Sequence, residues 1–259
     1  MQRLYRAGEG DFEVSSEETR EIGSYNKAMR VLAIGDIHGC SKAFDLVLEA
    51  VQPREDDLVV TLGDYVDRGP DSAGVIERLL ALRQRCQLVC LRGNHEIMML
   101  AARADEERRG LWLGYGGKET VASYAKSLSG GNLASVPPRH WVFLEKGLVD
   151  FHETDTHFFV HANAYPEIEL AEQPDVILYW EPFRDLGQHD NGKIMVCGHT
   201  TQKAGVPLLL DHAICIDTWV YGQGWLTCLD VTSGQLWQAN QQGEKRSARL
   251  EDVANREVY

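Results

Sequence analysis

Two carboxylates and a guanidinium lie in one short segment, residues 63–69, with the sequence GDYVDRG. The segment follows the apolar run 58–62, which is typical of a buried strand. Asp64 therefore stands at the predicted carboxyl end of a strand, where open α/β sheets build their ligand sites. By itself the segment fits a second interpretation equally well, a polar turn with an N-cap aspartate for a helix that begins near Asp71. The rest of the chain decides between the two.

A second candidate site segment, residues 35–39 with the sequence GDIHG, follows the apolar run 30–34. Residues two apart on an extended chain point the same way, so Asp36 and His38 could share a metal ion. Taken alone, the pair also fits an aspartate that caps the next helix beside a surface histidine.

A third segment, residues 92–96 with the sequence RGNHE, follows the run 87–91 and offers Asn94. Two further histidines, His161 and His199, come after the predicted strands 156–160 and 193–197. Each histidine taken singly would better fit a hydrogen-bonded structural role. Five polar loops at the ends of five predicted strands favour a common site instead.

The elements that must position these residues alternate along the chain. Helices are predicted over 41–51, near 72–85 and from about 97 to 108, each after one of the first three strands. Three such units imply a largely parallel sheet. Strand-like runs at 206–210, 214–217, 225–231 and 235–238 look antiparallel and could form a second sheet packed on the first.

We therefore predict an α/β fold in which a two-sheet β-sandwich is flanked by helices and the metal site lies at the carboxyl ends of the strands. Residues 1–27 read as an acidic N-terminal extension, residues 28–240 as one domain, and residues 241–259 as a charged, lightly packed tail.

Composition limits the function. The net charge of -13 over 259 residues argues against nucleic acid as a partner, because phosphate backbones are bound chiefly by lysine and arginine. Any anionic substrate then needs a local cationic centre. We expect a cytoplasmic protein without a membrane partner, since no apolar run is long enough to cross a bilayer and the amino terminus lacks the pattern of a signal peptide. The six cysteines form no CxxC pair, which favours buried free thiols.

Taken in order, GDIHG, GDYVDRG, RGNHE, the histidine of VHAN and the histidine of GHT resemble the motifs of the PPP family of metallophosphatases, a calcineurin-like metallophosphoesterase group. The resemblance covers residues 29–230 and implies a metallophosphoesterase-like α/β/β/α fold. Within the family, the chain is similar to the small bacterial and bacteriophage protein serine/threonine phosphatases and to the symmetrical bis(5'-nucleosyl)-tetraphosphatases. Residues 161–163 read HAN where the eukaryotic enzymes have HGG, which favours the prokaryotic branch.

The resemblance implies two divalent metal ions. Asp36 and His38 would bind the first, Asp64 would bridge, and the second would be completed by Asn94, His161 and His199. Mixed carboxylate, imidazole and amide ligands suit Mn²⁺, Fe or Zn²⁺ rather than a thiolate-selective metal, and Mn²⁺ is the ion we expect.

The resemblance also implies the catalytic groups. His95 would be the general acid that protonates the leaving alkoxide, Asp67 would hold its imidazole, and Arg68 would bind two phosphate oxygens as a planar fork, with Asn94 also contacting substrate.

A second phosphate-binding arginine would be Arg184, in the segment WEPFR, although it could instead pair with Glu181 or Asp185 on the surface.

The function expected from the resemblance is hydrolysis of phosphoserine and phosphothreonine in proteins by direct attack of a metal-bound hydroxide, without a phosphoenzyme. The partner would be a phosphorylated protein or a small phosphoester. A symmetrical bis(5'-nucleosyl)-tetraphosphatase is the alternative, and an inactive binding module of the same fold is a third.

Overall fold

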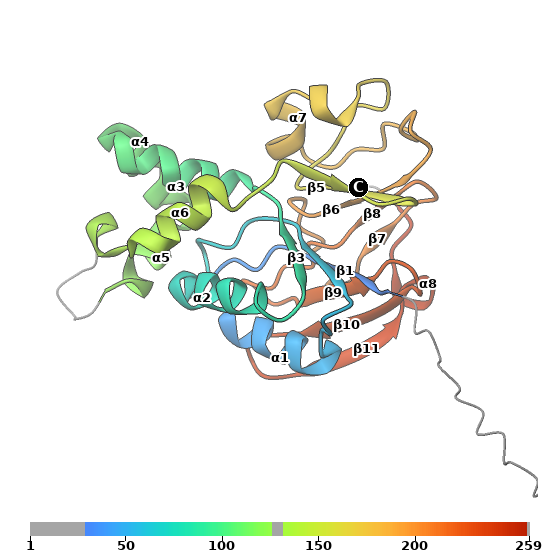
Figure 1. Ribbon diagram of the computed structural model, residues 1–259, viewed down its shortest axis with the longest axis horizontal. Coiled ribbons are helices and arrows are strands. Elements are labelled where there is room, and N and C mark those ends of the chain that lie inside the picture. The colour runs from blue at the N-terminus through green and yellow to red at the C-terminus, as the bar shows by residue number, and fades with distance from the viewer. Residues whose placement is uncertain (1–28, 126–131, 258–259) are drawn as a thin grey trace, which may run out of the picture.

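The computed structural model describes residues 29–125 and 132–257, so the predicted N-terminal extension lies outside the described residues. Two mixed β-sheets pack face to face with helices on both outer sides, as Figure 1 shows. The predicted α/β sandwich is confirmed. None of the helices in the described ranges combines the length and hydropathy needed to span a membrane.

The first sheet has the strand order β11-β10-β9-β1-β2-β3. Its parallel strands are β1 (Val31–Ile34), β2 (Leu58–Thr61) and β3 (Gln87–Cys90). Its antiparallel strands are β9 (Leu226–Asp230), β10 (Gln235–Ala239) and β11 (Lys245–Arg249). The parallel arrangement of the first three strands was predicted. The assignment of the last strands to a second sheet was wrong, because β9 pairs directly with β1.

The second sheet has the order β4-β5-β6-β8-β7. The strands are β4 (Phe151–Glu153), β5 (His157–Val160), β6 (Ile194–Cys197), β7 (Leu208–Leu209) and β8 (Ala213–Cys215). The pairs β5–β6 and β6–β8 are parallel. As a result, β5 and β6 end at the same edge. The antiparallel arrangement predicted for the runs 206–210 and 214–217 is confirmed, because β7 and β8 pair antiparallel.

Alternating side chains of β1 connect the layers. Leu32 and Ile34 pack into the core beneath α1 and α2, whereas Val31 and Ala33 pack into the core between the sheets. A third core lies between the second sheet and α7.

The helices are α1 (Ser41–Val51), α2 (Ser72–Leu82), α3 (Asn94–Ala104), α4 (Glu106–Trp112), the π-helical turn η1 (Leu113–Gly117), α5 (Lys118–Ser123), η2 (Leu133–Ser135), α6 (Pro138–Lys146), η3 (Leu170–Glu172), α7 (Asp175–Tyr179) and α8 (Leu250–Val253).

Helix α3 begins three residues earlier than the predicted start at Ile97. The carboxylate of Glu96 accepts the backbone N–H of Gly93 at 3.0 Å, which closes the first turn. Asn94 and His95 therefore lie in the first turn of a helix rather than in a loop. The predicted helix is also divided at Asp105, whose side chain caps α4.

The prediction of a lightly packed tail over 241–259 was wrong for Lys245–Arg249 and Leu250–Val253. The first range is β11, paired along its length with β10, and the second is α8. Leu250 is only 7% exposed and packs into the core between the sheets. Ala248, Val253 and Ala254 pack against the same core, so apolar contacts hold a segment whose strand is otherwise largely exposed.

Asp57 ties the start of β2 to the chain on either side. Its buried carboxylate accepts from Nε of Arg30 at 3.0 Å and from Nη2 and the backbone N–H of Arg54 at 2.8 and 2.7 Å. Burial alone would raise the pKa of Asp57, but these hydrogen bonds hold it well below its usual range. We expect Asp57→Asn to lower the free energy of unfolding at pH 7 by about 2 kcal/mol.

Because the folded pKa is depressed, this stabilisation is present above the unfolded pKa of about 4 and is lost as the pH falls toward the folded value. Denaturant unfolding at pH 7 and pH 3 should therefore show a smaller difference between wild type and Asp57→Asn at the lower pH. Asp56→Asn is the matched control, because its side chain is 57% exposed. An equal difference at both pH values would contradict the ion-pair account.

Candidate metal centre

The polar loops that follow β1, β2, β3, β5 and β6 meet at one edge of the sandwich. Parallel pairing places the carboxyl ends of β1, β2 and β3 side by side, and those of β5 and β6 likewise. The side chains gathered there are mostly buried: Asp36, His38, Asp64, Asn94, His95 and His161 are each at most 7% exposed. The partly buried His199 supplies the fifth segment, so the residues predicted from five separate segments are brought together.

Asp64 lies at the centre of this cluster. Its Oδ2 is 3.4 Å from Nε2 of His38, and its Oδ1 is 3.5 Å from Nε2 of His161. Two groups of donor atoms share Asp64, one with His38 and His95 and one with His161 and His199, each within 4.8 Å. Burial raises the pKa of Asp64, but the neighbouring imidazoles, His161 first among them, lower it by more, so its pKa lies below the usual value. The shared carboxylate is therefore ionised and placed to bridge two cations.

The histidines of the cluster are held in tautomers that suit metal binding. Nδ1 of His38 donates to the carbonyl of Val66 at 3.0 Å, and Nδ1 of His161 donates to that of Leu62 at 2.7 Å. Nε2 of His199 donates to the carbonyl of Trp180 at 3.2 Å. In each ring the other nitrogen is unprotonated, as a metal ligand requires, and in His38 its lone pair accepts a hydrogen bond from Nη1 of Arg68 at 2.7 Å. Burial lowers the pKa of His199 to about 4, so it is neutral at pH 7.

Asp36 supplies the clearest sign that a cation belongs here. Its Oδ2 accepts the backbone N–H of His199 at 2.9 Å, whereas its Oδ1 is buried without any hydrogen-bond partner. Among the described residues, no other buried side-chain oxygen or nitrogen lacks a partner. Burial and the nearby Asp217 and Asp64 raise its pKa. A divalent cation would satisfy the unpaired oxygen and offset this repulsion, so the donor set fits a metal centre.

The backbone at the cluster is strained. Five of the seven non-glycine residues with positive φ in the described ranges are predicted site residues: His38, Asp64, Asp67, Arg68 and His199. Such conformations persist only where the surrounding structure enforces them, and they gather at functional sites. The N-cap of α2 is Asp71, whose carboxylate accepts from the N–H of Gly74 at 2.9 Å. Asp64 and Asp67 are therefore not needed as helix caps, which removes the alternative interpretation of that segment.

His95 is paired with Asp67 at the margin of the cluster. Its Nδ1 donates to Oδ2 of Asp67 at 2.7 Å, and its Nε2 faces Asp64 at 3.9 Å. Asp67 also accepts from Nε1 of Trp112 at 2.8 Å and from the hydroxyl of Thr120 at 2.7 Å. Burial lowers the pKa of His95, but the carboxylates of Asp64 and Asp67 raise it more, to above its ordinary value. The pair is thus suited to hold a proton on His95.

Arg68 points toward the histidines of the cluster. Its Nη1 donates to Nε2 of His38 at 2.7 Å, and its Cζ lies 4.6 Å from the ring centroid of Tyr221. The ring of Tyr221 also packs edge-on against His38, with centroids 4.9 Å apart. Arg68 therefore places a cation beside this cluster, in a chain whose net charge is -13.

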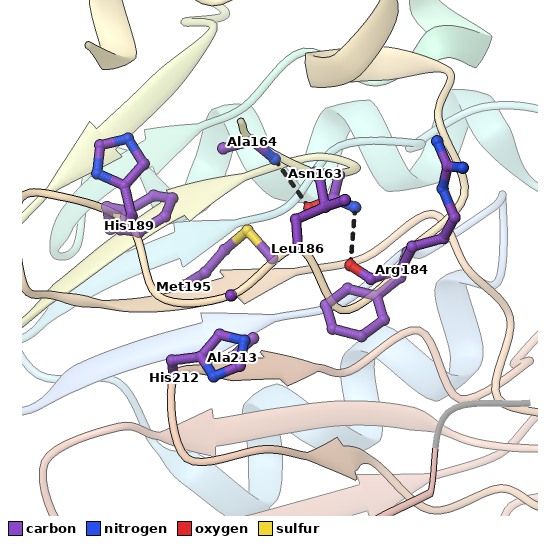
Figure 2. Close-up of a pocket in the computed structure, with 11 residues that line it drawn as sticks. Asn163, Ala164, Arg184, Leu186, His189, Met195, His212 and Ala213 are labelled. Atoms are coloured by element: carbon purple, nitrogen blue, oxygen red, sulfur yellow. Dashed lines mark hydrogen bonds between the residues drawn. The ribbon is translucent and has the colours of Figure 1, made fainter. Parts of the chain in front are cut away.

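The structure does not bring Arg184 to this cluster. Its side chain is 62% exposed and pairs with Glu181. In Figure 2 its guanidinium points away from the small pocket between Asn163, His189 and His212, and only its carbonyl turns inward, accepting from Asn163 at 3.3 Å. This placement favours the surface ion pair that the sequence left open.

Residues 29–203 match the family described as calcineurin-like phosphoesterase. The chain belongs to this family. It is 44% identical over 88 residues to serine/threonine-protein phosphatase 1 of Salmonella typhimurium (strain LT2), a match covering 34% of this chain and 38% of that protein. It is 43% identical over 76 residues to the symmetrical bis(5'-nucleosyl)-tetraphosphatase of Acidovorax sp. (strain JS42), covering 29% of this chain and 26% of that protein. The matched segments thus span well under half of these relatives.

The structure of a cold-active protein-tyrosine phosphatase from a psychrophilic Shewanella species resembles this chain with a TM-score of 0.55 at 16% identity, over 85% of this chain and 80% of that one. At this identity the likeness concerns the fold. The resemblance to metallophosphatases inferred from five motifs is confirmed by the family match.

Three residues that contact this phosphoesterase site were not predicted. Trp112 and Thr120, which lie 45 and 53 residues after Asp67 in the chain, donate hydrogen bonds to its carboxylate. The ring of Tyr221 makes a cation–π contact with the guanidinium of Arg68. None stands at the end of a predicted strand or within a recognisable motif. Only the unusual density of tryptophan and glycine after Leu111 marked that region.

Proposed function

We propose that the chain is a metal-dependent phosphatase that hydrolyses phosphoserine and phosphothreonine in proteins. The observation that carries this proposal is the buried, partnerless oxygen of Asp36 within a cluster of histidines around Asp64. An arginine and a histidine–aspartate pair lie directly beside that cluster.

The residues divide the work as follows. Asp36, His38, Asp64, Asn94, His161 and His199 would hold two divalent ions, with Mn²⁺ the ion proposed. When bound, such ions supply Lewis-acid polarisation of phosphoryl oxygens and activate water at neutral pH. Arg68 binds two phosphate oxygens through its planar fork. His95 donates the proton on Nε2 to the leaving oxygen. The carboxylate of Asp67 accepts a hydrogen bond from Nδ1–H of His95 and keeps the ring oriented.

The substrate class is supported by the similarity to a named serine/threonine-protein phosphatase. The similarity to symmetrical bis(5'-nucleosyl)-tetraphosphatases supports the second candidate, hydrolysis of dinucleoside polyphosphates. A comparison of kcat/KM on a phosphoserine peptide, p-nitrophenyl phosphate and diadenosine tetraphosphate separates the two. The proposal requires the phosphopeptide to be the better substrate, and a marked preference for the dinucleotide would replace it with the second candidate.

Arg68 and Arg184 offer a direct comparison of two arginines. We expect Arg68→Ala to lower kcat/KM by about tenfold to a hundredfold and to weaken inhibition by inorganic phosphate, because it removes charge-assisted hydrogen bonds to phosphate. Arg184→Ala should change both quantities less than twofold, since its guanidinium is exposed and paired with Glu181. Steady-state kinetics with phosphate as inhibitor measures both effects. A loss in Arg184→Ala equal to that in Arg68→Ala would restore Arg184 as a phosphate ligand.

A further inference from the structure

Both carboxylate oxygens of Asp67 accept hydrogen bonds. Its Oδ2 accepts from Nδ1 of His95 at 2.7 Å and from Nε1 of Trp112 at 2.8 Å. Its Oδ1 accepts from the hydroxyl of Thr120 at 2.7 Å. The residue is fully buried, and a carboxylate shielded from water needs donors of this kind, because an unpaired buried charge is costly. Trp112 and Thr120 therefore provide the hydrogen bonds that solvent provides to an exposed aspartate.

These two donors also fix how the carboxylate of Asp67 is turned. The torsion about the Cβ–Cγ bond of an aspartate has a broad energy minimum, so the plane of the carboxylate rotates unless its neighbours hold it. Here Thr120 holds Oδ1 and Trp112 holds Oδ2. The orientation of the His95 ring in turn depends on Oδ2, which accepts its Nδ1–H. The two donors thus reach the imidazole through one carboxylate.

The backbone of Asp67 is held by the same threonine. Its N–H donates to the hydroxyl of Thr120 at 2.8 Å and to that of Ser72 at 3.1 Å. The φ of Asp67 is +73°, in the left-handed region. A residue other than glycine keeps such a conformation only where its surroundings enforce it. Thr120 therefore holds both the backbone and the side chain of Asp67.

Trp112 and Thr120 come from a segment that is folded tightly enough for both to reach one carboxylate. Trp112 ends α4 and Thr120 lies in α5, with the turn η1 between them. Within η1, Gly116 has a φ of +110°, which glycine adopts without strain, and its carbonyl accepts the backbone N–H of Arg68 at 3.1 Å. A Cβ at Gly117 would lie 2.5 Å from the ring of Trp112. The two glycines thus allow the close packing of this segment.

Helix α5 is anchored beside the start of α2, as Figure 1 shows. The hydroxyl of Ser123 accepts the backbone N–H of Ala73 at 3.1 Å and donates to the carbonyl of Thr120 at 2.7 Å. The hydroxyls of Thr120 and Ser72 lie 2.9 Å apart. The position of Thr120 is therefore set by two helices that contain none of the proposed metal ligands.

We propose that Trp112 and Thr120 are positioning residues for the proton donor His95, an inference that rests on the proposed role of His95 as general acid. They act through Asp67: by holding its carboxylate, they hold the imidazole whose Nε2 carries the proton. Misplacement of a catalytic group by about 1 Å can cost about 100-fold in rate. The loss should fall on kcat rather than KM, because the proton is transferred in the transition state.

The first test replaces Thr120 in the intact, Mn²⁺-loaded protein. Thr120→Val removes the hydroxyl and keeps a similar shape, so it should lower kcat on a phosphoserine peptide by about tenfold to 100-fold. On p-nitrophenyl phosphate the loss should be less than about threefold, because a phenolate needs little protonation. KM and metal content should match wild type.

Two further threonine variants serve as controls. Thr120→Ser keeps the hydroxyl and should keep kcat close to the wild-type value. Thr227→Val removes another buried hydroxyl, which accepts from Nε2 of Gln238 at 2.7 Å, and should leave kcat on both substrates unchanged.

Trp112→Phe tests the other donor. It removes the indole N–H but keeps an aromatic ring, and it should also slow the phosphoserine peptide more than p-nitrophenyl phosphate. Trp141→Phe is the matched control, because Trp141 is also buried but its ring lies 4.4 Å from Cζ of Arg103. It should leave the ratio of kcat values for the two substrates unchanged.

A double-mutant cycle separates positioning from a general loss of structure. If Thr120 acts through His95, adding Thr120→Val to His95→Asn should slow the phosphoserine peptide by less than about twofold, because the positioned group is already gone. A loss as large as that in the wild-type background would overturn the inference. If circular dichroism shows that Thr120→Val does not fold, the same cycle with Trp112→Phe decides the question.

The outcomes separate the inference from the function on which it rests. A selective loss on the phosphoserine peptide in His95→Asn, without one in Thr120→Val or Trp112→Phe, would overturn the positioning role and leave the general acid standing. An equal defect on both substrates in His95→Asn would overturn the general acid itself, and the positioning role with it.

Discussion

Exhaustive chelation should abolish phosphoester hydrolysis, and Mn²⁺ should restore it better than Mg²⁺. The donor groups around Asp64 contain the imidazoles of His38, His161 and His199, which offer nitrogen ligands. Mg²⁺ prefers an octahedron of oxygen ligands and gives up its water reluctantly, whereas Mn²⁺ accepts nitrogen ligands more readily. Turnover of the metal-free protein, titrated with each ion, measures the effect.

A ligand substitution gives the same prediction without chelators. His161→Asn should weaken metal binding by more than about 100-fold, because loss of a mere hydrogen-bond partner of a ligand already weakens it by about 10–100-fold. His152→Asn is the control, since His152 lies on β4 and takes no part in the cluster of donors. Metal content by elemental analysis should fall in the first variant and not in the second. Full activity in a preparation shown to be free of metal would contradict the proposal that two metal ions are required for hydrolysis.

The residues at the strand ends could be predicted because their signal is local. Each polar segment directly follows an apolar run, and parallel strands necessarily bring their carboxyl ends to one edge of a sheet. Parallel pairing therefore places Asp36 beside Asp64 in the first sheet and His161 beside His199 in the second. The packing of the two sheets then brings the two pairs to one edge of the sandwich.

The contacts that the sequence did not reveal depend on tertiary packing. Trp112 reaches Asp67 only because α4 folds back over α3, and Tyr221 reaches Arg68 from the loop between β8 and β9. The choice of sheet for β9 was missed for a similar reason, since all five of its residues are buried and no alternation of polar residues shows which face it covers. Arg184 lies in the segment WEPFR, which resembles a family motif, but the sequence does not show that the folded chain leaves its side chain exposed.

His95→Asn should keep both metal ions yet lose a factor of about 10²–10⁴ in turnover on alkyl phosphates such as phosphoserine, the usual contribution of a general acid. The structure places Nδ1 of His95 against Asp67 at 2.7 Å, so the proton that can be transferred lies on Nε2. An alkoxide is a strong base and needs that proton in the transition state. A phenolate is a weaker base, so aryl phosphates should suffer less, and the defect should shrink as the pKa of the leaving group falls.

A leaving-group series from alkyl to nitrophenyl phosphates, run beside elemental analysis, separates this role from metal binding. His199→Asn is the contrasting variant, because His199 belongs to the donor group around Asp64 and its loss should lower metal content and slow all substrates alike. In His95→Asn the metal content should match wild type, and the rate should become steeply dependent on leaving-group pKa. A lost metal ion in His95→Asn, or a defect of the same size across the series, would show that His95 acts as a ligand or a structural residue, because only the loss of a proton donor at the leaving oxygen makes the rate more sensitive to that pKa.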